Sequence, residues 1–281
     1  MMKVLVTGFA GQLGYDVAAE LTARGISFIA ADKNDFDLTD AEAVKGFVGA
    51  CRPDVIIHCA AYTAVDKAEE DSAVCYKVNV AGTQNLAKAA GETQAKFVYI
   101  STDYVFDGEK DEPYEVDDPT APKTVYGATK LEGENRVRHA CPKHFIIRTA
   151  WVFGKNGNNF VKTMLRLGKE RDSISVVCDQ LGSPTYTKDL ARLICDMIQT
   201  EKYGTYHATN EGFCSWSDFA YEIMQQAGLS TRVAPISSSE YPAKAKRPMN
   251  SRLSKQKLID CGFTPLPEWK DALRRFLKET E

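Results

Sequence analysis

The chain has 281 residues, 44% of them hydrophobic and 26% charged, with a formal net charge of −3. A chain of this length forms one large domain or up to two smaller ones, and its slightly acidic balance argues against a general nucleic-acid-binding protein, which carries a basic excess. No apolar run approaches the roughly 18 residues of a membrane-spanning helix, and the apolar first residues run directly into a glycine turn, so we expect a cytoplasmic protein that binds neither nucleic acid nor membrane.

The first 150 residues alternate short apolar runs with amphipathic segments, a pattern typical of parallel βαβ units. The first helix should end near Gly25, where glycine can adopt a left-handed conformation, and Thr39-Asp40-Ala41-Glu42 has the spacing of a capping box that opens another helix. The pattern predicts an α/β protein with a Rossmann-type, doubly wound parallel sheet, with strands at residues 3–7, 27–31, 55–59, 97–101 and 145–148.

The regular alternation weakens after Trp151. The later segments predict further helices and strands. The helices are placed at residues 159–171, 188–199, 215–226 and from about 268, and the strands at 173–178 and 204–210. We expect a Rossmann domain and a smaller C-terminal α/β lobe over the carboxyl edge of the sheet, the first from residues 1–150 with return segments near 180–205, the second from residues 151–179 and 206–281.

The eight cysteines and four histidines are scattered, with no Cys-x-x-Cys pair and no histidine at zinc-finger spacing. Several cysteines, such as Cys59 and Cys195, lie in apolar segments. We therefore predict buried, reduced thiols and no metal site.

Gly8, Gly11 and Gly14 follow the first strand and open the first helix, so the backbone can turn tightly and aim helix N–H groups at a pyrophosphate. A tight strand-to-helix turn needs glycine whether or not it binds a ligand, and alanine stands where a Gly-x-Gly-x-x-Gly motif has its second glycine. Asp32, at the end of the second strand, can accept hydrogen bonds from an adenosine ribose and favours NAD, whereas the adjacent Lys33 could tolerate the 2′-phosphate of NADP. Both NADH and NADPH stay open.

Tyr126-Gly-Ala-Thr-Lys130 places a phenol and an ammonium one turn apart on one helix face. Such a pair arises by chance in many surface helices, so its weight comes from the glycine turn and Asp32. A ketone reduction requires a proton donor within reach of the oxygen that becomes charged, and Tyr126 is the candidate. We expect Lys130 to lower the pKa of Tyr126 from its ordinary value of about 10.

Two charged stretches stand out. Residues 107–118 carry seven acidic residues and are interpreted as a solvated loop, whereas residues 243–257 hold six basic residues and no acidic one. The basic stretch is either a plain solvated face or a surface that meets a diphosphate, and the sequence leaves both open.

Several motifs spread over almost the whole chain carry a resemblance to a known family. They include Gly8-Phe-Ala-Gly-Gln-Leu-Gly14, Ile100-Ser-Thr-Asp-Tyr-Val-Phe-Asp-Gly108, Tyr126-Gly-Ala-Thr-Lys130, Arg148-Thr-Ala-Trp-Val-Phe-Gly154 and Arg247-Pro-Met-Asn-Ser251. With them the chain resembles the extended short-chain dehydrogenase/reductases and, within that superfamily, the dTDP-4-dehydrorhamnose reductases. The resemblance implies NADH- or NADPH-dependent reduction of the 4-keto group of dTDP-4-dehydro-L-rhamnose to dTDP-L-rhamnose, for cell-surface polysaccharides, by a monomer or homodimer.

The resemblance also implies which residues bind the cofactor. They lie in the glycine turn, at the ends of the second and third strands and on the Tyr126 helix: Gly8, Gly11, Gln12, Leu13, Gly14, Asp32, Lys33, Asp37, Leu38, Ala60, Ala61, Tyr62, Thr63, Tyr126 and Lys130. Residues 11–13 would hold the diphosphate, Asp32 the ribose, and Asp37 and Leu38 the adenine side. Residues 61–63 would line the path to the nicotinamide.

The implied catalytic set is Tyr126, Lys130 and Thr102, whose hydroxyl would be offered to the ketone oxygen, with Ser101 as a less favoured substitute. The implied substrate-binding residues are Val65, Thr102, Asp103, Tyr126, Trp151 and Arg247. From the residues alone Trp151 fits a core position as well as a ligand contact, and the resemblance favours contact. Arg247 is expected to pair with the nucleotide diphosphate.

Two other functions are alternatives to this one. An epimerase, a dehydratase or another nucleotide-sugar reductase would keep the fold and the three catalytic residues but change the substrate or return the hydride. A non-catalytic, NADP-binding regulatory subunit would need no proton donor, so the complete set of Tyr126, Lys130 and Thr102 argues against it.

Overall fold

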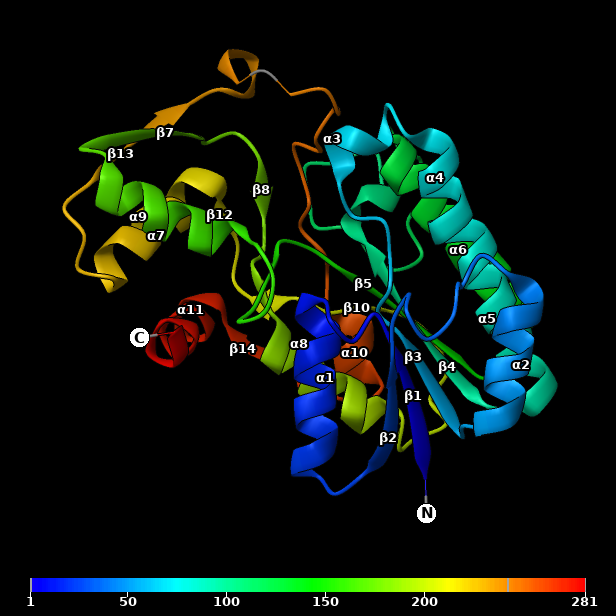
Figure 1. Ribbon diagram of the computed structural model, residues 1–281. Helices are drawn as coiled ribbons and strands as arrows, with labels where there is room; N and C mark the ends of the chain where they lie inside the picture. The colour runs from blue at the N-terminus through cyan, green and yellow to red at the C-terminus, as the bar shows by residue number, and fades with distance from the viewer. Residues whose placement is uncertain (1, 242, 281) are drawn as a thin grey trace.

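The structure, a computed structural model, describes residues 2–241 and 243–280. Its centre is a six-stranded sheet with the strand order β10-β5-β4-β3-β1-β2, and every neighbouring pair is parallel (Figure 1). This confirms the Rossmann-type, doubly wound sheet. The strands are β1 (Lys3–Thr7), β2 (Ser27–Ala31), β3 (Val55–His58), β4 (Lys96–Thr102), β5 (His144–Thr149) and β10 (Gly204–His207).

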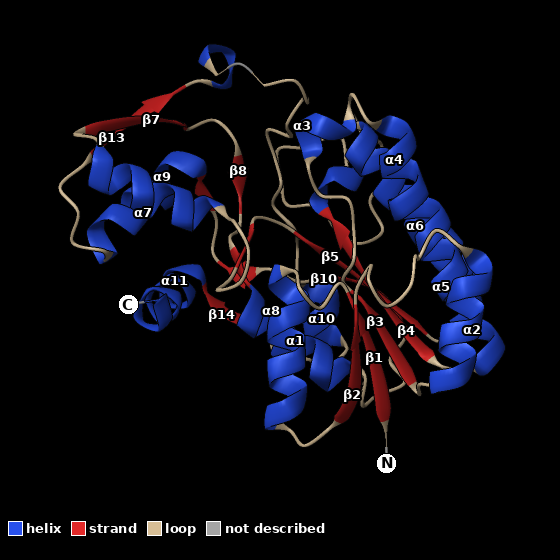
Figure 2. Cartoon of the chain, viewed as in Figure 1, coloured by secondary structure: helices blue, strands red, loops and turns tan. Residues whose placement is uncertain are grey.

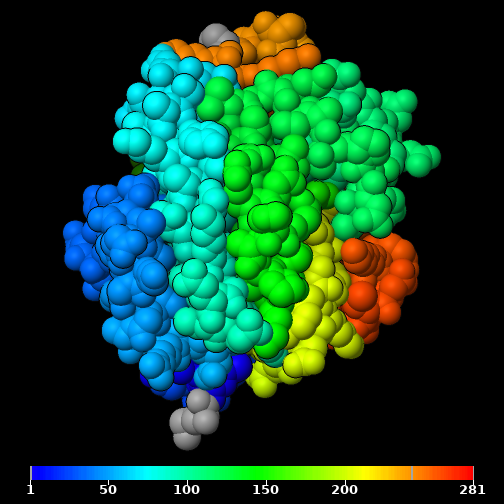
Figure 3. All heavy atoms as spheres, turned by 90° about the vertical axis from the view of Figure 1, so that its right-hand side faces the viewer, coloured from blue at the N-terminus to red at the C-terminus, as the bar shows by residue number. Residues whose placement is uncertain are grey.

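Helices cover both faces of the sheet (Figure 2). Alternate residues of β1 divide between the two cores: Val4 and Val6 pack with one helical layer, and Leu5 with the other. The first layer contains α1 (Gln12–Ala23), α8 (Thr187–Met197) and α10 (Gln256–Asp260). The second contains α2 (Ala41–Cys51), α5 (Thr83–Thr93) and α6 (Val125–Ala140), which lie side by side on the face that Figure 3 shows. Burial on both faces is why the strands have nearly continuous apolar sequences.

Short elements lie between β3 and β5. The chain runs through α3 (Val65–Ala68), then through α4 (Ser72–Tyr76) and a π-helical turn, η1 (Lys77–Gly82), directly into α5. A short 3₁₀ turn, η2 (Asp103–Val105), follows β4. π-helical turns occur frequently at functional sites.

A smaller lobe packs around its own aromatic core, which includes Phe153, Tyr186, Phe219, Trp269 and Phe276. Its helices are α7 (Phe160–Glu170), α9 (Trp216–Gln226) and α11 (Trp269–Thr280). A parallel pair joins β7 (Ser173–Val177) to β13 (Arg232–Ile236), from which the chain continues into η3 (Ser238–Glu240). The other strands form two-stranded pairs: β6 (Val152–Phe153) with β9 (Thr185–Tyr186), β8 (Leu181–Gly182) with β12 (Cys214–Ser215), and β11 (Asn210–Glu211) with β14 (Leu266–Glu268).

The packing of three later elements can be compared with the expected division into two lobes. α8 and β10 return to the sheet, and so does α10, whose Leu258 packs in the same core as Phe263, Leu266 and the sheet. The packing of α10 supports moving residues 256–266 from the smaller lobe to the sheet, and the division itself stays a prediction. No helix among the described residues is long and apolar enough to cross a membrane.

Two helix boundaries test the expected caps. Gly25 has φ +65°, as predicted for the end of α1. The capping box at Thr39 is wrong, because the cap of α2 is Asp40: its carboxylate accepts hydrogen bonds from the backbone N–H groups of Glu42 and Ala43 at 2.9 and 3.1 Å. The Thr39 hydroxyl instead donates to Asp37 at 2.9 Å. Aspartate caps a helix as well as threonine does, so the spacing alone does not choose between neighbours.

Candidate active site

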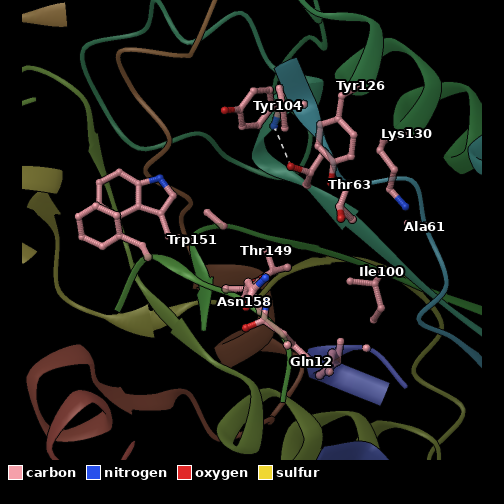
Figure 4. Close-up of a pocket in the computed structure, with 18 of the residues that line it drawn as sticks. Gln12, Ala61, Thr63, Ile100, Tyr104, Tyr126, Lys130, Thr149, Trp151 and Asn158 are labelled. Atoms are coloured by element: carbon pink, nitrogen blue, oxygen red, sulfur yellow. Dashed lines mark hydrogen bonds between the residues drawn. The ribbon is translucent and has the colours of Figure 1, made fainter. Parts of the chain in front are cut away.

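One cavity of about 1310 Å³ lies at the carboxyl ends of the parallel strands and extends into the smaller lobe. Ligands of open α/β sheets bind at this edge. The cavity is lined by all the site residues expected from the sequence except Gly14 and Tyr62. Figure 4 shows Tyr126 and Lys130 beside each other, with Trp151 across the cavity and Gln12 and Asn158 at its lower side.

The glycine turn fits a dinucleotide diphosphate. Gly8 has φ +67°, and a Cβ there would lie 2.5 Å from the Ala60 nitrogen. At Gly14 a Cβ would lie 2.3 Å from the Gly8 oxygen, so this third glycine lets α1 pass close to the turn and lines no part of the cavity. Gly11 caps α1 without any side-chain hydrogen bond to the helix, which leaves the first N–H groups of α1 to an anion.

The residues expected at the adenosine end lie after β2. Asp32 lines the cavity and accepts a hydrogen bond from the Asn34 nitrogen at 2.7 Å, and the exposed Lys33 lies beside it. A hydrogen bond from the Thr39 backbone lowers the pKa of Asp37, so this carboxylate is charged at neutral pH. Leu38 packs where Gly82 has no side chain: a Cβ on Gly82 would lie 1.6 Å from Leu38 Cδ1.

The side chains of the segment after β3 point in two directions. Ala60, Ala61 and Thr63 line the cavity, whereas Tyr62 does not. The Tyr62 hydroxyl donates to Asp71 at 3.3 Å, and its backbone exchanges two hydrogen bonds with the Asn79 side chain, at 2.8 and 3.1 Å. The tyrosine ring is therefore directed to the outer helices, and the predicted contact of Tyr62 with the cofactor receives no support from its side chain.

Tyr126 lies in the first turn of α6, where Thr124 caps the helix by accepting a hydrogen bond from the Gly127 nitrogen at 3.0 Å. The Tyr104 ring packs edge-on against the Tyr126 ring, with centroids 5.6 Å apart. Thr102 ends β4 and is buried at the floor of the cavity. The structure thus brings the expected set of Tyr126, Lys130 and Thr102 to one wall of the cavity.

Asp103 follows Thr102 and is almost completely buried, with 4% exposure. The Thr102 hydroxyl donates to its Oδ1 at 2.9 Å, whereas Oδ2 has no hydrogen-bond partner among the described residues. Burial raises the pKa of Asp103 to about 6. Because Oδ2 is buried without a partner, the ionised form of Asp103 is disfavoured in this position.

Trp151 and Trp216 form a stacked pair on the opposite wall, with ring centroids 3.7 Å apart. Trp151 has φ +50°, and a Cβ on Gly182 would lie 2.6 Å from its indole ring. The ring is thus held between a glycine and a second tryptophan. Trp151 fits both a core position and a ligand contact, because it packs against the core of the smaller lobe and also lines the cavity.

Arg247 lines the cavity between the two lobes. Its guanidinium donates to Asp66 at 2.6 Å and to the Tyr104 hydroxyl at 3.3 Å, and the neighbouring Lys244 pairs with Glu70. The basic stretch is therefore not a plain solvated face, because it reaches acidic residues on and just after α3. These ion pairs link the segment before α10 to the sheet side of the cavity.

Comparison with known proteins identifies the family. The model of the RmlD substrate binding domain family matches residues 2–281. The chain is 42% identical over 287 residues to the dTDP-4-dehydrorhamnose reductase of Aggregatibacter actinomycetemcomitans, covering 98% of both chains. The chain belongs to the dTDP-4-dehydrorhamnose reductase family. It is also 41% identical to the spore coat polysaccharide biosynthesis protein SpsK of Bacillus subtilis, covering 99% of this chain and 98% of that one.

A solved structure gives the same result for the fold. The dTDP-4-dehydrorhamnose reductase of Bacillus anthracis, in complex with NADP, has a TM-score of 0.97 and 46% sequence identity to this chain, covering 99% of this chain and 100% of that one. The expected family and fold class are confirmed.

One electrostatic expectation for this member of the reductase family is wrong. The pKa of Tyr126 is raised above its ordinary value, because burial and the nearby Asp103 carboxylate disfavour the phenolate. Lys130 is itself buried, and burial lowers its pKa to about 7. A lysine that is only partly protonated at neutral pH favours the phenolate less than a fully charged ammonium would. Tyr126 therefore keeps its proton at neutral pH.

Sequence reasoning missed several lining residues of this cavity. Trp216 reaches the cavity through its packing against Trp151, whereas Tyr104 follows β4 and packs against Tyr126. The loop after β6 was also missed: Asn156 donates to the Ala10 carbonyl at 2.6 Å, and Asn159 to Gln12 at 3.0 Å. This loop therefore lies against the glycine turn, about 145 residues away in the chain.

Proposed function

We propose that this protein reduces the 4-keto group of dTDP-4-dehydro-L-rhamnose to give dTDP-L-rhamnose, with NADPH or NADH as the reductant. The observation that carries the proposal is that Tyr126, Lys130 and Thr102 line the same cavity as the glycine turn, Asp32 and Trp216. Membership in the dTDP-4-dehydrorhamnose reductase family and the likeness to a structure in complex with NADP support it.

The residues that would hold the nicotinamide cofactor are the glycine turn of Gly8, Gly11, Gln12 and Leu13, with Asp32 at the ribose. When bound, the cofactor supplies the hydride. Lys33 is exposed beside Asp32, so the pair accommodates either cofactor form, and we propose that both are used.

Tyr126 would donate its phenolic proton to the ketone oxygen as that oxygen gains negative charge. Its raised pKa suits a donor, because the phenol is fully protonated before the reaction. The Thr102 hydroxyl would turn from Asp103 to donate to the same oxygen, and Lys130 would bind the nicotinamide ribose beside the phenol. The three side chains thus divide proton donation, charge stabilisation and orientation.

The substrate would lie between Asp103 and the stacked pair of Trp151 and Trp216, since an aromatic face suits a base or a hexose ring. Val65 would complete the contact near the sugar. Arg247 would meet the diphosphate, exchanging its contact with Asp66 for a phosphate oxygen.

The decisive experiment is an NADPH and NADH oxidation assay with enzymatically prepared dTDP-4-dehydro-L-rhamnose, with the product identified by NMR. We expect dTDP-L-rhamnose. A product with 6-deoxy-L-talose configuration would assign another reductase activity, and stoichiometric NAD bound to the purified protein would favour an epimerase or dehydratase. No oxidation with any 4-keto nucleotide sugar, together with tight co-purification of another enzyme, would favour the regulatory subunit.

We further propose that the protein acts in the cytoplasm, where its nucleotide-sugar substrate would be made, as a monomer or homodimer. Light scattering coupled to size-exclusion chromatography distinguishes these two states from larger assemblies, and fractionation of cells tests the location.

A further inference from the structure

Lys130 lies against the ring of a buried tyrosine. Its Nζ is 4.0 Å from the centroid of the Tyr99 ring, well within the distance of a cation–π interaction. Tyr99 stands in the middle of β4, is fully buried, and donates its hydroxyl to the Lys130 backbone oxygen at 3.3 Å. One side chain therefore contacts both the backbone and the ammonium of Lys130.

The packing around Tyr99 is close. A Cβ on Gly133 would lie 2.2 Å from the Tyr99 hydroxyl, so only glycine at this position lets α6 lie directly over the phenol. On the other side of the ring, His58 of β3 stacks at a centroid distance of 6.0 Å. The position of the ring is thus determined by the sheet and by the backbone of α6 together, and not by the Lys130 side chain.

The buried anion that most favours the charged form of Lys130 is Glu134, and its carboxylate is bound by other residues. Glu134 lies one turn further along α6, has no exposed surface, and accepts two hydrogen bonds from Arg148 of β5, both at 2.9 Å. It also accepts from the Ser101 hydroxyl at 2.6 Å and from Arg138 at 2.7 Å. Two guanidinium groups therefore share its charge, which leaves less of it for Lys130.

The other titratable groups near Lys130 are neutral at pH 7. Burial lowers the pKa of His58 of β3 to about 3, and raises the pKa of Cys59, which follows β3, to about 12. The Cys75 thiol of α4 and the Tyr99 phenol of β4 also have pKa values raised by burial. Tyr126 on α6 itself is protonated, as argued above.

We propose that Tyr99 is a positioning residue that holds Lys130 as an ammonium ion through the face of its ring and fixes the helical turn that carries Lys130 through its hydroxyl. The contact itself is independent of the reaction, whereas its consequence for catalysis rests on the proposed function. Burial disfavours the charged form of Lys130, and Glu134 offsets only part of this effect. The Tyr99 ring therefore stabilises a charge that burial opposes.

The test is a titration of Lys130 in the protein without added cofactor. Lysine labelled with ¹³C at Cε reports each side chain by NMR, and a buried lysine titrating near 7 is separated from exposed lysines, which titrate near ~10.4. Loss of that resonance in Lys130→Met assigns it. Tyr99→Leu removes the ring, and Tyr99→Phe is the matched control that keeps the ring and removes only the hydroxyl.

We expect the midpoint of Tyr99→Phe to stay near that of the wild type, and that of Tyr99→Leu to fall by roughly 0.4 to 1.5 pH units. The sign follows because losing an interaction made only by the charged form lowers the pKa. An unchanged or higher midpoint in Tyr99→Leu, or a Lys130 that titrates with the exposed lysines, overturns the proposal. If the leucine variant does not fold, Tyr99→Met, whose flexible side chain fills irregular space, takes its place.

Activity measurements separate this inference from the proposed function. In Tyr99→Leu the alkaline limb of the kcat profile should move to lower pH by the same amount, with the KM for the nucleotide sugar unchanged. If the NMR midpoint shifts as expected but the wild type reduces no nucleotide sugar, the proposed function fails and the role of Tyr99 stands. If the wild type is active and the midpoint does not shift, the reverse holds.

Discussion

Replacing Asp103 by asparagine should stabilise the protein at neutral pH while impairing the site. Asp103 is 4% exposed, one carboxylate oxygen has no hydrogen-bond partner among the described residues, and burial raises its pKa from 3.8 to about 6. A shift of about 2 pKa units corresponds to roughly 3 kcal/mol, by which ionisation of this group opposes folding. Asparagine has nearly the same shape, keeps an acceptor for the Thr102 hydroxyl, and cannot ionise.

The sign follows from linkage. The folded-state pKa of Asp103 is raised, so the unfolded chain releases this proton first and the free energy of unfolding falls as the pH rises from about 4 to 6. Below pH 4 both states are protonated and the cost disappears. The stability advantage of Asp103→Asn should therefore be near zero at pH 4 and grow to about 3 kcal/mol by pH 7.5.

Urea unfolding followed by tryptophan fluorescence between pH 4 and 8 measures this difference directly. Asp107→Asn is a control of opposite sign, because a hydrogen bond from Tyr114 lowers the pKa of Asp107, and stability that depends on its charge is lost as the pH falls. An Asp103→Asn advantage that does not change with pH would refute the reasoning. We also expect a raised KM for the nucleotide sugar, since stability is commonly sacrificed at binding sites.

Three further changes test other parts of the site. Tyr126→Phe should lower kcat about 10²- to 10⁴-fold in the NADPH oxidation assay and leave NADPH affinity unchanged in a fluorescence titration; undiminished turnover would remove Tyr126 from the mechanism. Arg148→Met leaves the Glu134 carboxylate buried without its bidentate partner and should lower the free energy of unfolding by about 3–5 kcal/mol in urea, whereas a loss below ~1 kcal/mol would contradict the buried pairing. Trp216→Ala removes the ring stacked on Trp151 and should raise the KM for the nucleotide sugar with little change for NADPH; equal effects on both would argue against separate halves of the cavity.

The sheet was predictable because its signals are local. β1 and β2 have the predicted bounds, since each apolar run ends at a residue that favours a turn, Gly8 or Asp32. Elements that depend on distant partners were not predictable in this way. The two-residue strands β8 and β12 exist only because Gly182 and Cys214 meet through the tertiary fold, and no local pattern distinguishes these strands from loop.

The residues of the candidate site show the same difference between local signals and contacts with distant parts of the chain. Residues placed by their position after a strand, such as Asp32 and Thr102, line the cavity as expected. Tyr62 also follows a strand, but Asn79 from the π-helical turn binds its backbone and its ring turns outward. Trp216 could not have been found, because its contact with Trp151 requires a positive φ at Trp151 and the missing side chain of Gly182.

Tyr126 and Lys130 on α6 show that residue spacing predicts which side chains lie together better than it predicts their protonation. Tyr126 and Lys130 do line one wall of the cavity, as a four-residue step requires. The step says nothing about solvent, and burial reverses the expected effect: the pKa of the phenol rises and that of the ammonium falls. As the proton donor of a reductase, Tyr126 must hold its proton until the ketone oxygen becomes basic. The charge of Lys130 depends on the groups that surround it. The features that set these properties, Tyr99 beneath the ammonium and Asp103 beside the phenol, come from another part of the chain, on β4 and the turn that follows it.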